Sequence, residues 1–153
     1  MAGLSRGAGE AGQEPRSVSE ALARAYRNAV YTIETAEGPH TLTVDIKDVV
    51  LDRLLDAHGV ATAARLTAAN PGSAAELSPE VNAAANRRLA DDLARRGLRW
   101  LDCASAAPDG TWREEGLLVL GIRRDEAEAL ARVYGQSGFL WFERGRPVDL
   151  VML

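Results

Sequence analysis

Two asparagines lie on one predicted helix at a spacing that can build a polar site. Asn82 and Asn86 are four residues apart, so both fall on one stripe of the helix. Leu89 and Leu93 continue this stripe, which should therefore face the core. A half-buried amide needs hydrogen-bond partners, because an unpaired buried polar group costs about 1–3 kcal/mol. The partners are either a ligand or the backbone of a neighbouring loop.

The loop before this helix carries further polar residues. Asn70, Pro71 and Ser73 follow a predicted strand, and ligands often bind where a strand ends and a helix begins. Gln136 follows the glycine that ends a later helix, and it either reaches a ligand or caps its own turn. In the alternative interpretation the amides only fix the backbone of the loop, which is the commoner role of buried amides.

These residues favour a non-catalytic binding or interaction module. Its polar, Asn-lined pocket would take a small ligand or a segment of a protein partner. The residues predicted to line this pocket are the following: Asn70, Ser73, Asn82, Asn86 and Gln136.

Two adjacent carboxylates suggest a different chemistry. Glu114 and Glu115 begin a predicted strand, and a carboxylate can act as a general base. Neighbouring strand residues point to opposite faces, so the two cannot form a close pair with each other. Either one alone could work beside amides that bind a substrate. The alternative to a binding module is therefore a small hydrolase or transferase that uses Glu114 or Glu115.

Several other chemistries find no support in the sequence. His40 and His58 lie far apart and Cys103 is the only cysteine, so neither a metal site nor an internal disulfide is expected. The chain has no G-x-S-x-G and no G-x-x-x-x-G-K motif, and no cofactor is predicted. The net charge of −4 and the lack of aromatics in the strand 117–120 argue against nucleic-acid binding.

The composition is typical of a folded, water-soluble protein. Of the 153 residues, 46% are hydrophobic and 26% are charged, which suits one domain with a modest core. The apolar runs are far shorter than the roughly 20 residues that a membrane-spanning helix needs. The first residues lack the apolar stretch of a signal peptide. A single cysteine fits a reducing compartment, so we expect a cytoplasmic protein.

The elements that must position these residues follow from periodicity and capping. Residues 1–16 are rich in Gly, Ala and Glu and are predicted to form a disordered tail before a single α+β domain over 17–153. The first part of this domain is predicted to contain a helix, a hairpin and a second helix: 17–28, strands 30–35 and 41–46, and 49–58.

The second part of the chain predicts a regular alternation of elements. Their order is strand, helix, strand, strand, helix, strand: 61–68, 78–96, 98–105, 115–121, 124–134 and 139–143. This order predicts a ferredoxin-like βαββαβ core over about 61–143, with both helices on one face of a mainly antiparallel sheet. A last strand over 148–153 could form an exposed edge that joins two copies into a homodimer.

Several segments together resemble a known bacterial family. They are the run 51–59, the run 66–73 with its Thr-Ala-Ala-Asn-Pro, the paired helix asparagines, the run 110–121 and the Tyr-Gly-Gln at 134–136. As a set they resemble the bacterial domain of unknown function 3293, and the resemblance covers about Ala21 to Phe142. It implies a small bacterial protein and supplies no activity, substrate or cofactor. The chain departs from the usual family pattern at three positions: Ala69, Val81 and Ala85.

Overall fold

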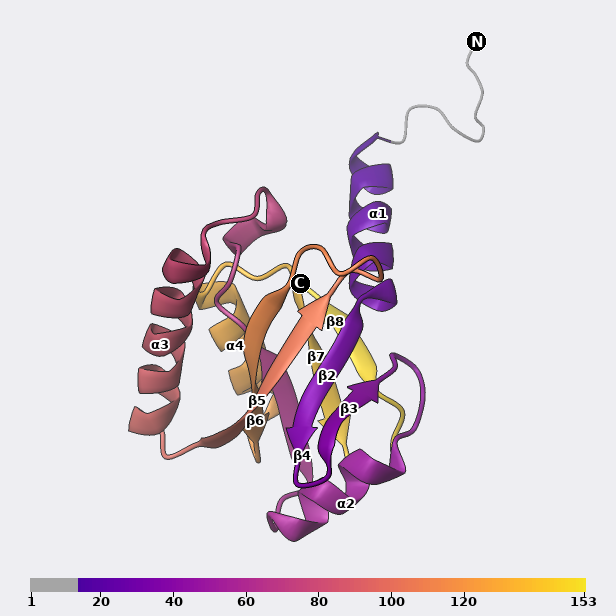
Figure 1. The fold of residues 1–153 in the computed structure, drawn as a ribbon, viewed down its shortest axis with the longest axis vertical. Coiled ribbons are helices and arrows are strands. Elements are labelled where there is room, and N and C mark those ends of the chain that lie inside the picture. Colours follow the sequence, from indigo (N-terminus) through magenta and orange to yellow (C-terminus); the bar gives the residue numbers. More distant parts are fainter. Residues whose placement is uncertain (1–13) are drawn as a thin grey trace.

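A seven-stranded sheet with antiparallel pairing organises the chain (Figure 1). The structure is a computed structural model, and it describes residues 14–153. The helices of this part are α1 (Glu14–Asn28), α2 (Val49–Ala57), α3 (Pro79–Arg95) and α4 (Arg124–Val133). The strands are β2 (Val30–Thr35), β3 (Gly38–Leu42), β4 (Thr62–Leu66), β5 (Arg99–Ala106), β6 (Glu114–Leu120), β7 (Gly138–Glu143) and β8 (Asp149–Met152). The expected mixed α+β class is confirmed.

The strand order determines which segments meet at the centre. It runs β3-β2-β5-β6-β4-β7-β8, and each strand pairs antiparallel with its neighbours. Both β4 and β5 flank β6, so these two strands run parallel to each other. β8 corresponds to the predicted C-terminal strand and is one of the two edge strands of this sheet.

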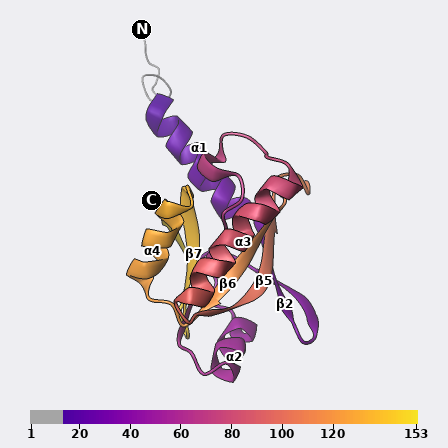
Figure 2. The same cartoon turned by 90° about the vertical axis from the view of Figure 1, so that its left-hand side faces the viewer.

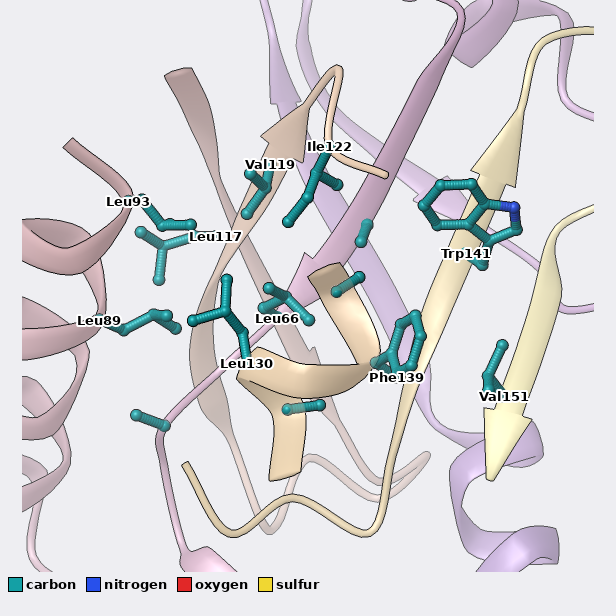
Figure 3. Close-up of a cluster of buried hydrophobic side chains, with 14 of the residues drawn as sticks. Leu66, Leu89, Leu93, Leu117, Val119, Ile122, Leu130, Phe139, Trp141 and Val151 are labelled. Atoms are coloured by element: carbon teal, nitrogen blue, oxygen red, sulfur yellow. The ribbon is translucent and has the colours of Figure 1, made fainter. Parts of the chain in front are cut away.

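The helices α3 and α4 cover one face of the sheet (Figure 2). α3 begins as its sequence predicts, because the Ser78 side chain accepts a hydrogen bond from the Val81 N–H and Pro79 follows it. Alternate strand residues point toward these helices, and each buried aliphatic side chain contributes about 1.5–3 kcal/mol. Buried members of this layer include the following: Leu66, Leu89, Leu93, Leu117, Val119 and Leu130 (Figure 3).

A second buried layer lies on the opposite face of the sheet. It brings Leu51 and Leu55 of α2 together with apolar residues of the hairpin and of the central strands. Asp48 caps α2, since its carboxylate accepts from the Leu51 N–H at 2.9 Å and lies 2.8 Å from Nε2 of His40. α1 contacts β8 and precedes β2 directly. The two sides of the sheet are therefore covered by different parts of the chain.

Two boundaries near the start of the chain differ from those expected. The second hairpin strand spans Gly38–Leu42 instead of 41–46, because Thr35 already pairs with Gly38 across a shorter turn. Asp45, inside the predicted strand, adopts a left-handed φ of 71°, which an extended strand does not allow. α1 begins at Glu14 rather than at residue 17. Most of the predicted tail, residues 1–13, lies outside the described residues.

Asp92 connects the two helices that cover the sheet. Its carboxylate accepts hydrogen bonds from Nε of Arg96 at 3.0 Å and from the hydroxyl of Tyr134 at 3.2 Å. The hydrogen bond from Arg96 is the main cause that holds the pKa of Asp92 below its usual value. The folded state therefore binds this proton less tightly than the unfolded chain does.

We expect Asp92→Asn to remove a small, pH-dependent part of the stability. A lowered folded-state pKa stabilises the fold above the unfolded pKa, about 3.9, and this stabilisation is lost as the pH falls through the folded value. The side chains of Asp92 and Arg96 are 19% and 41% exposed, so solvent screening limits the effect to about 0.5 kcal/mol. Urea unfolding at pH 7 should show this difference from wild type. A difference of the same size at pH 3 would contradict the assignment.

Candidate functional site

The loop after β4 is held by asparagines of α3. Oδ1 of Asn86 accepts a hydrogen bond from the Ala68 N–H at 2.7 Å, and its Nδ2 donates to the carbonyl of Glu115 at 3.0 Å. Asn86 therefore ties α3 to the end of β4 and to the start of β6. Both asparagines are half-buried and turned inward, as the helix stripe predicted.

Asn70 is the centre of this hydrogen-bond network. It is only 3% exposed and has a left-handed φ of 47°. Its N–H donates to Oδ1 of Asn82 at 2.9 Å, and its own Oδ1 accepts from Nδ2 of Asn82 and from the Leu77 N–H. Its Nδ2 donates to Oε2 of Glu114 at 2.9 Å. The network thus joins the loop, the start of α3 and one carboxylate.

Gln136 and its neighbour hold the same loop from the side of α4. Nε2 of Gln136 donates to the carbonyls of Ala69 at 3.0 Å and Tyr134 at 3.2 Å. The Gly72 N–H donates to the carbonyl of Gly135 at 2.7 Å. Four of the five predicted site residues therefore meet around this loop, where most of their hydrogen bonds go to backbone groups. The fifth, Ser73, lines a separate cavity, which also contacts Tyr31 and Trp112.

A surface groove lies outside the asparagine network. It has a volume of about 650 Å³, and its wall includes the following: Asn70, Asn82, Asn86, Glu114 and Glu115. Each of the three amides already uses its oxygen and at least one N–H within the protein. The groove therefore presents polar side chains whose hydrogen-bonding capacity is largely used.

The two candidate carboxylates have different surroundings. Glu115 pairs with Arg113, whose Nη2 lies 2.9 Å from Oε2, and its side chain is 67% exposed. Only its backbone carbonyl belongs to the network, where it accepts from Thr67 Oγ1 and from Asn86. Glu114 instead places its carboxylate against Asn70. Of the pair, Glu114 alone brings a carboxylate to the asparagines.

Arg65 is a buried cation that the motif analysis missed. It lies on β4, is only 5% exposed and points to the sheet face opposite α3 and α4. Nη2 donates to Oγ of Ser105 at 3.0 Å and to the carbonyl of Glu114 at 3.2 Å. The guanidinium lies 5.7 Å from the ring centroid of Tyr31. Gly116 packs against it so closely that an added Cβ would lie 3.0 Å from Nε.

The charge of Arg65 is poorly compensated. Within residues 14–153, Nε is buried without a hydrogen-bond partner, and no hydrogen bond between Nη1 and a described residue is found, although the guanidinium lies close enough to Cys103 to lower the pKa of its thiol. No carboxylate of the same residues forms an ion pair with this guanidinium. A buried ion without a counter-ion costs several kcal/mol. Such a cost is typical of a group kept for function.

Arg65 lines a cavity beneath α1. The cavity has a volume of about 260 Å³ and also contacts Tyr31, Ser73, Ser105, Trp112 and Glu114. Figure 1 shows α1 above the loop that joins β5 to β6, which supplies Trp112. α1 and the residue after it present one face to the cavity, with residues at positions i, i+3, i+4 and i+7: Leu22, Ala25 and Tyr26 of the helix, and Ala29. The helix thus forms an apolar wall opposite the guanidinium.

Backbone strain gathers at the same place. Ser73 and Trp112 have φ values of 56° and 54°, in the left-handed region that bulky residues rarely adopt. Such strained residues cost about 1–3 kcal/mol each and concentrate at functional sites. Both of these residues line the cavity beneath α1.

Burial favours the neutral forms of the Tyr31 hydroxyl and the Cys103 thiol. Desolvation raises the pKa of Tyr31, although the charge of Arg65 opposes the shift. The Tyr31 hydroxyl donates to the carbonyl of Tyr26, which links β2 to α1. Burial also raises the pKa of the Cys103 thiol, so it is a weak nucleophile. The strongest polar features of the cavity are therefore one guanidinium and the Glu114 carboxylate.

The described residues form neither a metal-binding cluster nor a membrane-spanning helix. Among residues 14–153, no three His, Cys, Asp or Glu side chains gather closely enough to hold a metal ion. No helix of the described chain is both long enough and apolar enough to cross a bilayer.

One signal in the sequence could have pointed to Arg65. Arg65 is the only charged residue of β4 (Thr62–Leu66), whose other members are one threonine, two alanines and one leucine. A charge at the centre of a strand that is expected to be buried requires a partner or a function. The α1 wall carries no comparable signal, because its residues follow an ordinary amphipathic pattern.

Comparison with known proteins finds one family model that matches part of the chain. Residues 66–138 match a family model described as "Protein of unknown function (DUF3293)", which confirms the resemblance noted in the sequence. The matched segment contains the asparagine network, Glu114 and Gln136, whereas Arg65 and α1 precede it. The chain matches no curated protein and no solved structure.

Proposed function

We propose that residues 66–138, the segment that matches the DUF3293 family model, frame a ligand-binding module. In this proposal a small molecule occupies the cavity between α1 and Arg65, and the module is not an enzyme. The observation that carries the proposal is Arg65, a residue only 5% exposed whose guanidinium has no described ion-pair partner, at the wall of a cavity of about 260 Å³. A ligand would supply the missing partner.

The asparagines have a positioning role in this proposal. Asn82 and Asn86 hold the backbone of the loop after β4, and Asn70 orients the Glu114 side chain. Glu114 in turn accepts from Arg65 through its carbonyl, so the network and the cavity share one residue. This arrangement supports the interpretation in which the amides act on the protein, and it moves the proposed ligand from the groove to the cavity.

The same observations support a finer description of the fold. We propose a ferredoxin-like core formed by β4 to β7 with α3 and α4. The order β5-β6-β4-β7 and the position of both helices on one face support it. A cytoplasmic location and a homodimer through β8 are also proposals, and the second is supported by the position of β8 at the sheet edge.

A second candidate function is catalysis by Glu114. One observation favours it: the Glu114 side chain lines the cavity and is oriented by Asn70. Glu115 has no such support, since its carboxylate pairs with Arg113 at the surface. A molecule recovered chemically changed after incubation with the protein would favour the enzyme over the binding module.

A variant that fills the cavity tests the proposed function. Ala25→Phe places a ring in the space beneath α1 and should abolish binding of one-ring probes such as phenylacetate and phenylacetamide. In the wild-type protein we expect these probes to shift the NMR amide signals of Tyr31, Ser105 and Trp112. Mass spectrometry of the probes after the titration would reveal turnover.

The matched control adds the same side chain one residue away. Arg24 and Ala25 are both exposed positions of α1, but Arg24 does not line the cavity, so Arg24→Phe places the ring outside it. We expect it to bind the probes like the wild-type protein. Probe-induced shifts that persist in Ala25→Phe, or that occur away from the cavity, would overturn the proposed site.

A further inference from the structure

We propose that the ligand is a small monocarboxylic acid with an apolar body, and that its carboxylate binds Arg65. This inference rests on the proposed function and adds the chemical class of the ligand. It follows from the free donors of the guanidinium, the apolar walls, the size of the cavity and the position of Glu114.

The free donor of Arg65 determines which ligand group binds it. Both Nη2 hydrogen bonds go to Ser105 and to the Glu114 carbonyl, and Nε is enclosed beside Gly116. Nη1 is therefore the nitrogen left for a ligand. It can only donate, so the ligand group must accept, and a charged oxygen also neutralises the buried cation. The hydroxyl of Ser73 lies at the same cavity as a further donor.

The remaining walls select the rest of the molecule. α1 contributes aliphatic and aromatic surface through Leu22 and Tyr26, and Trp112 contributes an indole. Aromatic side chains bind planar apolar groups well, and they do so best where water is excluded. A volume of about 260 Å³ lies at the lower end of ligand sites, which are roughly 300–1,000 Å³. One ring with a short acidic arm suits these walls.

Glu114 favours a single negative charge on the ligand. Glu114 lines the same cavity, and its carboxylate, which is held by Asn70, lies close enough to Tyr31 to raise the pKa of that hydroxyl. Repulsion grows with the charge of the ligand, so a doubly charged phosphate meets about twice the repulsion that a carboxylate meets. Only one guanidinium is present to compensate it. A monocarboxylate leaves Arg65, Glu114 and the ligand with one net negative charge, whereas a doubly charged phosphate leaves two.

Phenylacetate and its neutral amide form the central comparison. We expect the wild-type protein to bind phenylacetate at least tenfold more tightly than phenylacetamide in isothermal titration. Acetate lacks the apolar body and inorganic phosphate carries more charge, so both should bind at least tenfold more weakly than phenylacetate. This comparison uses only the wild-type protein, so it does not depend on how any variant folds.

Arg65→Met identifies the residue responsible. Met has a similar length and no charge, but it leaves the Ser105 hydroxyl and the Glu114 carbonyl without this donor, so the variant should fold with a loss of at most about 1–3 kcal/mol in stability. It should lose the preference for phenylacetate over phenylacetamide. Arg87→Met, on an exposed position of α3, serves as the matched control and should keep the preference.

The possible outcomes separate this inference from the proposed function. Equal binding of phenylacetate and phenylacetamide at the cavity would overturn the carboxylate while the binding module stands. Tighter binding of phosphate than of phenylacetate would overturn the monocarboxylate class. Absence of binding by every probe, with no shift at the cavity residues, would overturn the proposed function itself.

Discussion

Replacing Asn86 with alanine is expected to lower the free energy of unfolding by about 3 kcal/mol. The substitution removes the acceptor of the Ala68 N–H and the donor to the Glu115 carbonyl. Ala68 is 2% exposed, so water cannot replace the lost acceptor without opening the loop. For a chain of this length such a loss corresponds to a fall in melting temperature of roughly 6–12 °C. Denaturant unfolding and calorimetry would measure both quantities.

The same substitution at an exposed asparagine provides the control. Asn28 ends α1 and is exposed, so Asn28→Ala should change the stability by less than about 0.5 kcal/mol. A loss below about 1 kcal/mol for Asn86→Ala would show that the amide does not hold the loop. The folded Asn86→Ala protein should still bind phenylacetate, because Asn86 does not line the cavity beneath α1. Loss of binding with little loss of stability would instead favour the asparagines as direct ligand contacts.

The inward orientation of the asparagines could be predicted because it depends on local geometry. Helical periodicity alone places Asn82 and Asn86 on the stripe of the buried leucines, and the cap formed by Ser78 and Pro79 fixes where that helix begins. The strand boundaries in the second half of the chain were also close, since turn residues and apolar runs mark them. The predicted position of the second hairpin strand is wrong because Thr35 pairs with Gly38 across a shorter turn, which places the strand at Gly38–Leu42.

The cavity could not be predicted because it depends on segments that are distant in sequence. Arg65 meets Tyr31 from β2 and Ser105 from β5. These residues come together only through the strand order β2-β5-β6-β4. No local sequence pattern specifies the register between these strands, which places the three side chains beside one another. The hydrophobic pattern of α1 predicts that one of its faces is covered. It does not predict that a polar cavity lies beneath that face.

This dependence on strand order explains why the loop and the cavity work as a unit. The asparagine network fixes Glu114, and the Glu114 carbonyl accepts a hydrogen bond from Arg65. The flat surface against which the guanidinium lies comes from Gly116, two residues further along β6. The site is therefore as rigid as the packing between β4 and β6, and a change at this contact should affect stability and binding together.

Gly116→Ala is expected to destabilise the protein by about 3 kcal/mol, because overpacking in the sheet forces the two strands apart. The added Cβ would lie 2.9 Å from the backbone oxygen of Leu66 and 3.0 Å from Nε of Arg65. The backbone oxygen cannot move without disturbing the pairing of β4 with β6. The displaced guanidinium should also bind phenylacetate at least tenfold more weakly. Urea unfolding and isothermal titration would measure the two effects.

Gly97→Ala is the matched control, since it adds the same methyl group where nothing lies within 4 Å. Its φ of +73° alone should cost about 1 kcal/mol, and binding should not change. Combining Gly116→Ala with Arg65→Met separates the two close contacts. If the flexible Met side chain relieves the contact with residue 65, the double variant should lose less stability than the sum of the single changes. Strict additivity would assign the whole cost to the Leu66 oxygen, and an unchanged affinity in Gly116→Ala would contradict the role of this surface in placing the guanidinium.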